Sequence, residues 1–119
     1  MKIKVPTIEE LCNQLGSEYR ICIIDFERCI YRDFGNGFNV EISGANSNRA
    51  GKKVNLYLWY GTEVPNCFIV KIVNNVERTA EAIGSAVDNL KGYSDELIRQ
   101  GYNNGDAIFQ MLHPEFKNN

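Results

Sequence analysis

The chain has 119 residues, of which 44% are hydrophobic and 24% charged. This length is typical of one globular domain with a single core, so we expect one domain over residues 1–119. The formal net charge of −2 excludes a general electrostatic attraction to nucleic acid or to an anionic membrane, and we expect neither as a partner.

The first predicted element is a short helix that begins after Thr7. Thr7 and Glu10 have the spacing of a capping box, in which each side chain accepts a hydrogen bond from the other residue's backbone amide. Apolar residues follow at helical spacing, namely Ile8, Leu11, Cys12 and Leu15. Gly16 is placed to end the helix in the left-handed conformation.

Residues 19–34 are strand-like, but neither face of one continuous strand would stay apolar. We therefore expect a β-bulge or break near Asp25 to Arg28, which would exchange the two faces. After a turn signal at residues 34–38, Phe38, Val40 and Ile42 alternate with polar residues. That alternation predicts an amphipathic strand.

Residues 44–53 form a polar loop with three cations, Arg49, Lys52 and Lys53. The loop is not a phosphate-binding P-loop, because six residues separate Gly44 from Gly51 and no Ser or Thr follows Lys52. Two interpretations remain open: the cations are simply solvated, or they bind an anionic ligand.

Residues 53–73 predict the central hairpin of a sheet, with a turn that holds Gly61, Pro65 and Asn66. One face is apolar throughout, and we expect it to receive the helices; it consists of Val54, Leu56, Leu58, Tyr60, Phe68, Val70 and Ile72. The opposite face carries Tyr57, Trp59, Ile69 and Val73. We expect these four residues to bind a partner, unless residues 108–116 cover them.

Helical spacing returns after the hairpin. Asn74 or Asn75 is the expected cap of a helix whose apolar positions are Val76, Ala80, Ile83, Val87 and Leu90. A helix that continued to residue 100 would overhang strands of eight residues, so we expect a break at Gly92. Asp106 is expected to cap a last helix over residues 107–112, which Pro114 ends.

These elements predict an α+β fold. We expect an antiparallel sheet of three to four strands, with the N-terminal and C-terminal helices packed mainly on one face.

Cysteine and histidine positions do not favour a metal site. The four cysteines form no C-x-x-C pair, and the single histidine, His113, is far from them in sequence. We find no stretch apolar enough for a signal peptide or a membrane span. We therefore expect a cytoplasmic protein with free thiols and no cofactor or metal.

The residues that could carry catalysis are poorly arranged in sequence. A catalytic cysteine needs a base, and His113 lies beside a proline near the C-terminus. Asp25 and Glu27 could form a carboxylate pair at the expected bulge, but Arg28 and Arg32 suffice to balance them as an exposed strand pair. We therefore expect no catalytic activity.

Two functions remain. The first is a small protein-binding module, such as an adaptor, an immunity-type protein or an inhibitor, which could also self-associate as a homodimer through the face with Tyr57 and Trp59. The alternative is a small-molecule or nucleotide binder that uses the Gly44–Lys53 loop and the sheet aromatics.

Overall fold

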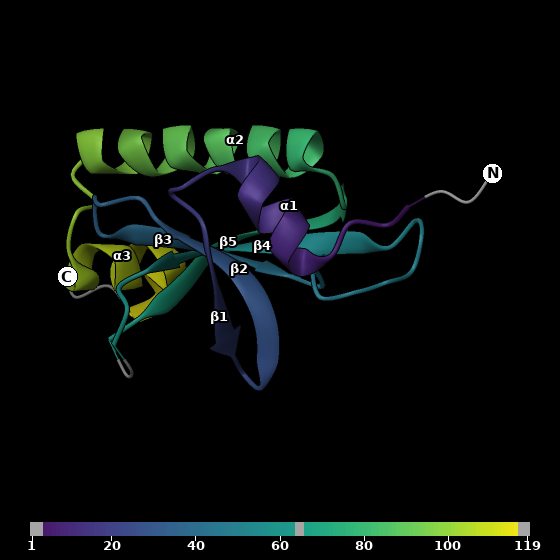
Figure 1. Cartoon of the computed structure of the whole chain (residues 1–119). Helices are drawn as coiled ribbons and strands as arrows, with labels where there is room; N and C mark the ends of the chain where they lie inside the picture. Colours follow the sequence, from purple (N-terminus) through teal and green to yellow (C-terminus); the bar gives the residue numbers. More distant parts are fainter. Residues whose placement is uncertain (1–3, 64–65, 117–119) are drawn as a thin grey trace.

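The computed structural model describes residues 4–63 and 66–116, so Pro65 of the expected turn and the last three residues lie outside the described part. The elements follow in the order α1 (Ile8–Leu15), β1 (Arg20–Ile24), β2 (Glu27–Asp33), β3 (Phe38–Ser43), β4 (Lys53–Tyr60), β5 (Phe68–Glu77), α2 (Ala80–Arg99), α3 (Gly105–Leu112) and the 3₁₀ turn η1 (Pro114–Phe116). The strands form one antiparallel sheet in the order β1-β2-β3-β4-β5 (Figure 1).

The predicted α+β class with an antiparallel sheet is confirmed, but the expected number of strands is wrong, because the described part of the chain forms a sheet of five. Residues 19–34 contain no bulge. They fold into β1 and β2, joined by a turn at Asp25 and Phe26, which both have positive φ. Glycine or asparagine usually occupies such turn positions, so the sequence lacks the common hairpin signal.

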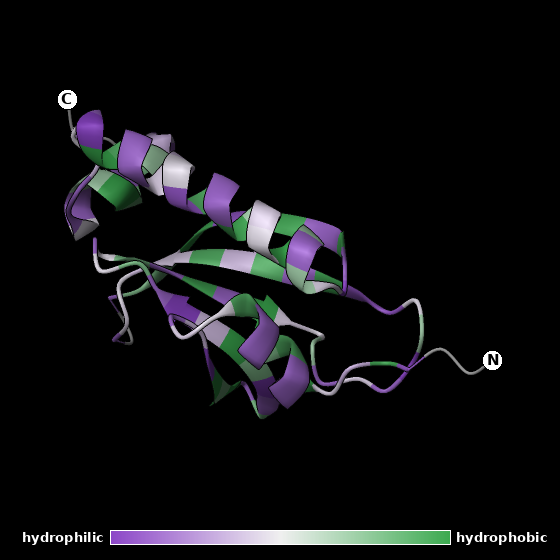
Figure 2. Ribbon diagram, turned by 45° about the horizontal axis from the view of Figure 1, so that its top comes forward, coloured by the Kyte–Doolittle hydropathy of each residue, from purple (hydrophilic) through white to green (hydrophobic). Residues whose placement is uncertain are grey.

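One core cluster combines side chains of the sheet with side chains of the helices. Its buried side chains come from α1 and α2 and from the alternating positions Phe38, Val40 and Ile42 of β3 and Val54, Leu56 and Leu58 of β4. Polar and apolar residues alternate along α2 (Figure 2), so the helix has one apolar side for this core. Ile108 of α3 joins the same cluster.

The capping box of the first helix is present, with Glu10 N–H donating to Thr7 Oγ1 at 3.1 Å. The later helix boundaries differ from the prediction. β5 continues to Glu77, and Thr79, rather than Asn74 or Asn75, caps α2. Likewise Asn104, two residues before Asp106, caps α3.

The predicted break at Gly92 is also wrong, because α2 runs without interruption from Ala80 to Arg99. The Ser94 hydroxyl donates to the Lys91 carbonyl within the helix instead of capping a new one. The part of α2 beyond Gly92 is supported by the turn before β3, where Asn36 Nδ2 donates to Ser94 Oγ and to Asp95 Oδ1. The end of α2 that extends beyond Gly92 is therefore held by hydrogen bonds to the turn before β3.

Candidate functional site

The sheet face opposite the core-facing side chains is here called the outer face. Alternation along each strand and the strand register assign its residues. They are Arg20, Cys22 and Ile24 of β1; Glu27, Cys29, Tyr31 and Asp33 of β2; Asn39, Glu41 and Ser43 of β3; Asn55, Tyr57 and Trp59 of β4; and Ile69 and Ile72 of β5.

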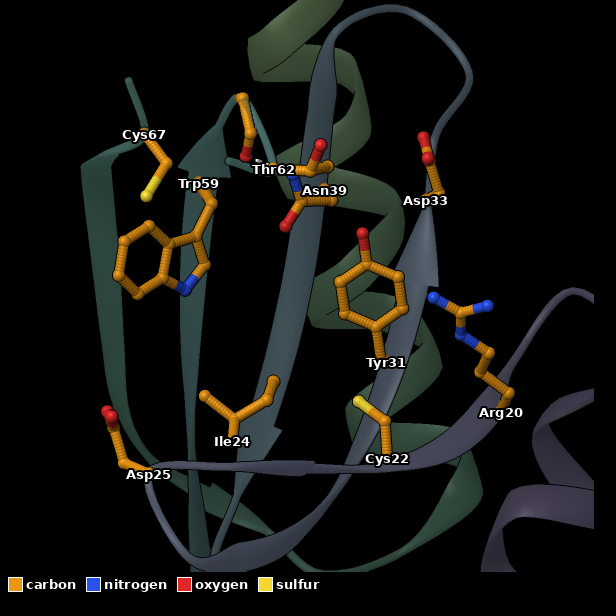
Figure 3. A pocket seen from close by; sticks show the side chains of 11 residues that line it. Arg20, Cys22, Ile24, Asp25, Tyr31, Asp33, Asn39, Trp59, Thr62 and Cys67 are labelled. Carbon is orange, nitrogen blue, oxygen red and sulfur yellow. Dashed lines mark hydrogen bonds between the residues drawn. The ribbon is translucent and has the colours of Figure 1, made fainter. Parts of the chain in front are cut away.

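The outer face contains a recess of about 550 Å³. Its lining comes from four strands, from the β1–β2 turn and from residues between β4 and β5, and consists of Arg20, Cys22, Ile24, Asp25, Tyr31, Asp33, Asn39, Trp59, Gly61, Thr62 and Cys67 (Figure 3). β1 and β4 are separated by two strands in the sheet, yet both line this recess. The sheet must therefore be strongly twisted and curled toward its outer face.

A buried carboxylate supports the central aromatic residue of this face. Glu41 is only 7% exposed, and its Oε1 accepts a hydrogen bond from Trp59 Nε1 at 3.0 Å. Its Oε2 accepts from the Cys29 thiol at 3.7 Å. Tyr31 and Tyr57 lie directly opposite Glu41 on the two neighbouring strands. These large neighbours cover a carboxylate that the amphipathic pattern alone would leave in water.

Burial is the main influence on the ionisation of this cluster. It raises the pKa of Glu41, although the hydrogen bonds from Trp59 and Cys29 act in the opposite direction. Burial, reinforced by the charges of Glu27 and Glu41, raises the pKa of Cys29 to about 12. Cys29 is therefore a neutral hydrogen-bond donor near pH 7 and not a nucleophile.

The recess combines an aromatic lining with charges of both signs. The Arg20 guanidinium lies 4.9 Å from the centre of the Tyr31 ring, across the β1–β2 pair. Asp25 lies in the β1–β2 turn, and Asp33 ends β2, where its Oδ1 accepts from Gly35 N–H at 2.8 Å. Among the described residues that line the recess, these two carboxylates outnumber the one cation, Arg20.

Asn39 connects the middle of the recess to its rim. Its Nδ2 donates to the Gly61 carbonyl at 2.9 Å, and the residue lies between Asp33 and Trp59 in the sheet register. Asn39 is buried despite its polar side chain. The segment that follows β4 is thus tied to the outer face by a defined contact.

The predicted partner-binding residues are brought together only in part. Tyr57, Trp59 and Ile69 lie on the outer face, but Val73 packs against the core cluster, so its predicted position was wrong. A register shift between Leu58 and Trp59 exchanges the faces of the following β5 residues. Ile72 consequently takes the outer position and is exposed.

The predicted anion-binding residues Arg49, Lys52 and Lys53 line a different recess, of about 620 Å³, together with Arg28 and Phe26. Two of the four cations there already have partners, because Lys53 forms an ion pair with Glu77 and Arg28 with Glu9. The start of the loop is held by Arg78, whose Nε and terminal NH2 group donate to the Ala45 carbonyl at 2.9 and 2.6 Å.

Asp25 and Glu27, which were considered as a carboxylate pair, have different surroundings in the structure. Asp25 lines the recess with Trp59, whereas the Glu27 carboxylate accepts from Ser43 Oγ at 2.9 Å and from Gly44 N–H at 2.6 Å. Glu27 therefore fixes the end of β3.

Sequence reasoning missed Arg20, Tyr31 and Asp33 as recess residues, and recognition of the turn at Asp25 would have placed all three on one face.

Comparison with known proteins finds no match to a family model, to a curated protein or to a solved structure. Within residues 4–63 and 66–116, no helix combines the length and the apolar character needed to cross a membrane. The same described residues contain no group of three or more His, Cys, Asp or Glu side chains arranged to hold a metal ion.

Proposed function

We propose that the protein is a protein-binding module that receives a basic segment of a partner protein in the outer-face recess and has no catalytic activity of its own. The observation that carries this proposal is the recess itself, whose lining combines an indole held by Glu41 with the carboxylates of Asp25 and Asp33. Adaptor, inhibitor and immunity-type proteins all need a surface of this kind. The four free cysteines are compatible with a cytoplasmic location.

Charge complementarity favours a basic partner. A lysine- or arginine-rich segment that lay in the recess would find the carboxylates of Asp25 and Asp33 and the rings of Trp59 and Tyr31 at separate points of the lining. Carboxylates attract the cation, and aromatic faces add a cation–π contribution of about 0.5 to 2 kcal/mol. Tryptophan and tyrosine are also residue types that dominate interface energies.

The hydrogen bond between Trp59 and Glu41 prepares the surface for binding. Because Glu41 fixes the indole, little side-chain entropy remains to be lost when a partner packs against Trp59. Ile69 and Ile72, both exposed on β5, extend the apolar part of the surface. In this proposal the N-terminal and C-terminal helices pack mainly on the core side and leave this face to the partner.

The experiment uses a photoreactive amino acid at Thr62, on the rim of the recess, and at Asn89, an exposed position of α2, as the control. Cell extract of the source organism is irradiated with each protein. We expect one protein to be cross-linked from position 62 and not from position 89, with the cross-link in a lysine- or arginine-rich segment. Equal labelling from both positions, or a cross-link in an acidic segment, overturns the proposal.

A charge-neutral double variant tests the electrostatic part. Asp25→Asn/Asp33→Asn keeps an acceptor for Gly35 N–H and a residue type that tolerates positive φ at position 25. The matched control is Glu81→Gln/Asp88→Asn, which removes the same charge from exposed positions of α2. Cross-linking from position 62 should fall only in the recess variant, and should fall in wild type as salt is raised. Equal capture by both variants contradicts a charge-directed interface.

A small-molecule binder is the second candidate, since a cavity of about 550 Å³ has the size of many ligand sites. The loop cations and the sheet aromatics line separate recesses, so a ligand that used both sets would have to extend beyond one of them. A thermal-shift screen with nucleotides, phosphorylated metabolites and small organic cations distinguishes the candidates. A ligand that stabilises wild type but not Trp59→Ala would favour this second function.

A further inference from the structure

The two edge strands of the sheet are protected to different extents. β5 contains two register shifts and a residue with positive φ, Asn75, and such irregularities discourage pairing with another strand. β1, by contrast, pairs with β2 over all five of its residues without any shift. A regular edge strand offers its free backbone groups to a further strand.

The turn defines which β1 groups are free. In a hairpin closed by two residues, the flanking pair exchanges both backbone hydrogen bonds, and bonded pairs recur at every second position. Arg20, Cys22 and Ile24 therefore bond to β2, and Ile21 and Ile23 direct their N–H and C=O groups outward. The Ile23 side chain is 73% exposed, and Phe26 beyond it is 103% exposed. Within residues 4–63 and 66–116, backbone groups without a strand partner and exposed apolar side chains thus lie together on one edge.

We propose that two copies of the chain pair through β1, antiparallel about Cys22, so that their sheets join. In this register Ile21 of each copy lies opposite Ile23 of the other, and all the outward N–H and C=O groups of these residues are paired. The exposed Ile23 side chain is then covered by Ile21 of the second copy. The two Cys22 residues face each other as a non-hydrogen-bonded pair, with Cα atoms about 4.5 Å apart.

The charges at the ends of β1 argue for a second copy as the occupant. Arg20 begins the strand, and Asp25 directly follows it on the same recess. In an antiparallel pair about Cys22, Arg20 of one copy lies next to Asp25 of the other, at both ends. The strand is therefore self-complementary in charge as well as in backbone pairing. Pairing through this edge involves Arg20, Cys22 and Asp25, which also border the recess, and leaves the recess residues Trp59 and Asn39 of each copy untouched.

Light scattering and sedimentation of the full chain test this proposal over a range of concentrations. Arg20→Glu and Asp25→Lys each replace two attractions with two repulsions, and we expect each to weaken the dimer about tenfold. The double variant Arg20→Glu/Asp25→Lys restores the attraction and should recover the dimer. This recovery also shows that a weak single variant is not simply unfolded. A monomeric wild type, or a double variant no stronger than the single variants, overturns the proposal.

Cysteine cross-linking tests the register. In a Cys67→Ser background, diamide should join two Cys22 thiols by a disulfide, with the two electrons and two protons passing to diamide, because the Cα separation lies within the range of disulfides. Cys22→Ala should abolish the linked dimer. A dimer that is not cross-linked at Cys22 contradicts β1 pairing. A dimer that is lost in Trp59→Arg but retained in the two single charge variants contradicts it too, because it would associate through the outer face.

Discussion

Trp59 and Glu41 are joined on the outer face by a 3.0 Å hydrogen bond from the indole Nε1 to a carboxylate oxygen that is almost completely buried. The two residues lie on neighbouring strands, and their pairing determines how the largest aromatic side chain of the recess is presented. A carboxylate in this position lowers stability unless its hydrogen bonds compensate for its desolvation.

The Trp59–Glu41 bond should appear as a coupling energy. Trp59→Phe removes the donor and leaves a buried acceptor unpaired, so we expect a loss of about 1 to 3 kcal/mol in the free energy of unfolding. A double-mutant cycle with Glu41→Leu, followed by urea unfolding, should give a coupling of about 1.5 to 3 kcal/mol. Tyr57→Phe on the same strand serves as the control. A coupling indistinguishable from zero would show that the hydrogen bond adds nothing to stability.

Glu41 should make stability depend on pH. Its pKa in the folded protein is raised above the ordinary value of 4.5, chiefly by burial, so the folded state holds this proton more tightly than the unfolded state. The contribution of Glu41 to stability is therefore fully present below pH 4.5 and is lost as pH rises through the folded pKa. Urea unfolding should show Glu41→Gln gaining stability relative to wild type between pH 4 and pH 7. A constant difference across that interval would contradict the raised pKa.

Phe26→Gly should stabilise the protein. Phe26 has a φ of 65°, and its side chain is fully exposed, so burial of the ring does not stabilise the folded state. Glycine relieves the strain of the left-handed backbone, but it also raises the entropy of the unfolded chain. The net result should be a gain of about 0.5 to 1 kcal/mol in the free energy of unfolding. Thermal and urea unfolding measure the change, with Gly35→Ala, at a φ of 75°, as the opposite control. A destabilised Phe26→Gly variant would mean that the Phe26 ring has a packing role.

Arg78 should be important for the loop that follows β3. Its guanidinium is buried, and Arg78→Ala leaves the Ala45 carbonyl without both hydrogen bonds, so we expect a loss of about 1 to 3 kcal/mol. Arg99→Ala, which breaks an exposed ion pair with Glu96, should change stability by less than about 1 kcal/mol. Equal effects of the two variants in urea unfolding would show that the Arg78 contacts do not anchor the loop.

Local patterns in the sequence were sufficient to predict several elements. The T-x-x-E capping box, the alternation over Phe38 to Ile42 and the two strands of the central hairpin depend on neighbouring residues, and all are present. The α+β class follows from the order of these elements. These features could be recognised because backbone geometry and side-chain periodicity act over a few residues.

Only the tertiary structure decided which side chains share a surface. The turn at Asp25 and Phe26 has no glycine, the register shift before Trp59 moves Val73 to the core, and α2 continues past Gly92 to positions where Asn36 from a distant turn donates to Ser94 and Asp95. The recess depends on the curl of the whole sheet, which brings β1 and β4 to one cavity. The sequence alone determined the first helix, the strands with regular alternation and the α+β class, whereas twist, bulges and long-range hydrogen bonds determined the candidate site, since these arise only when the strands pack together.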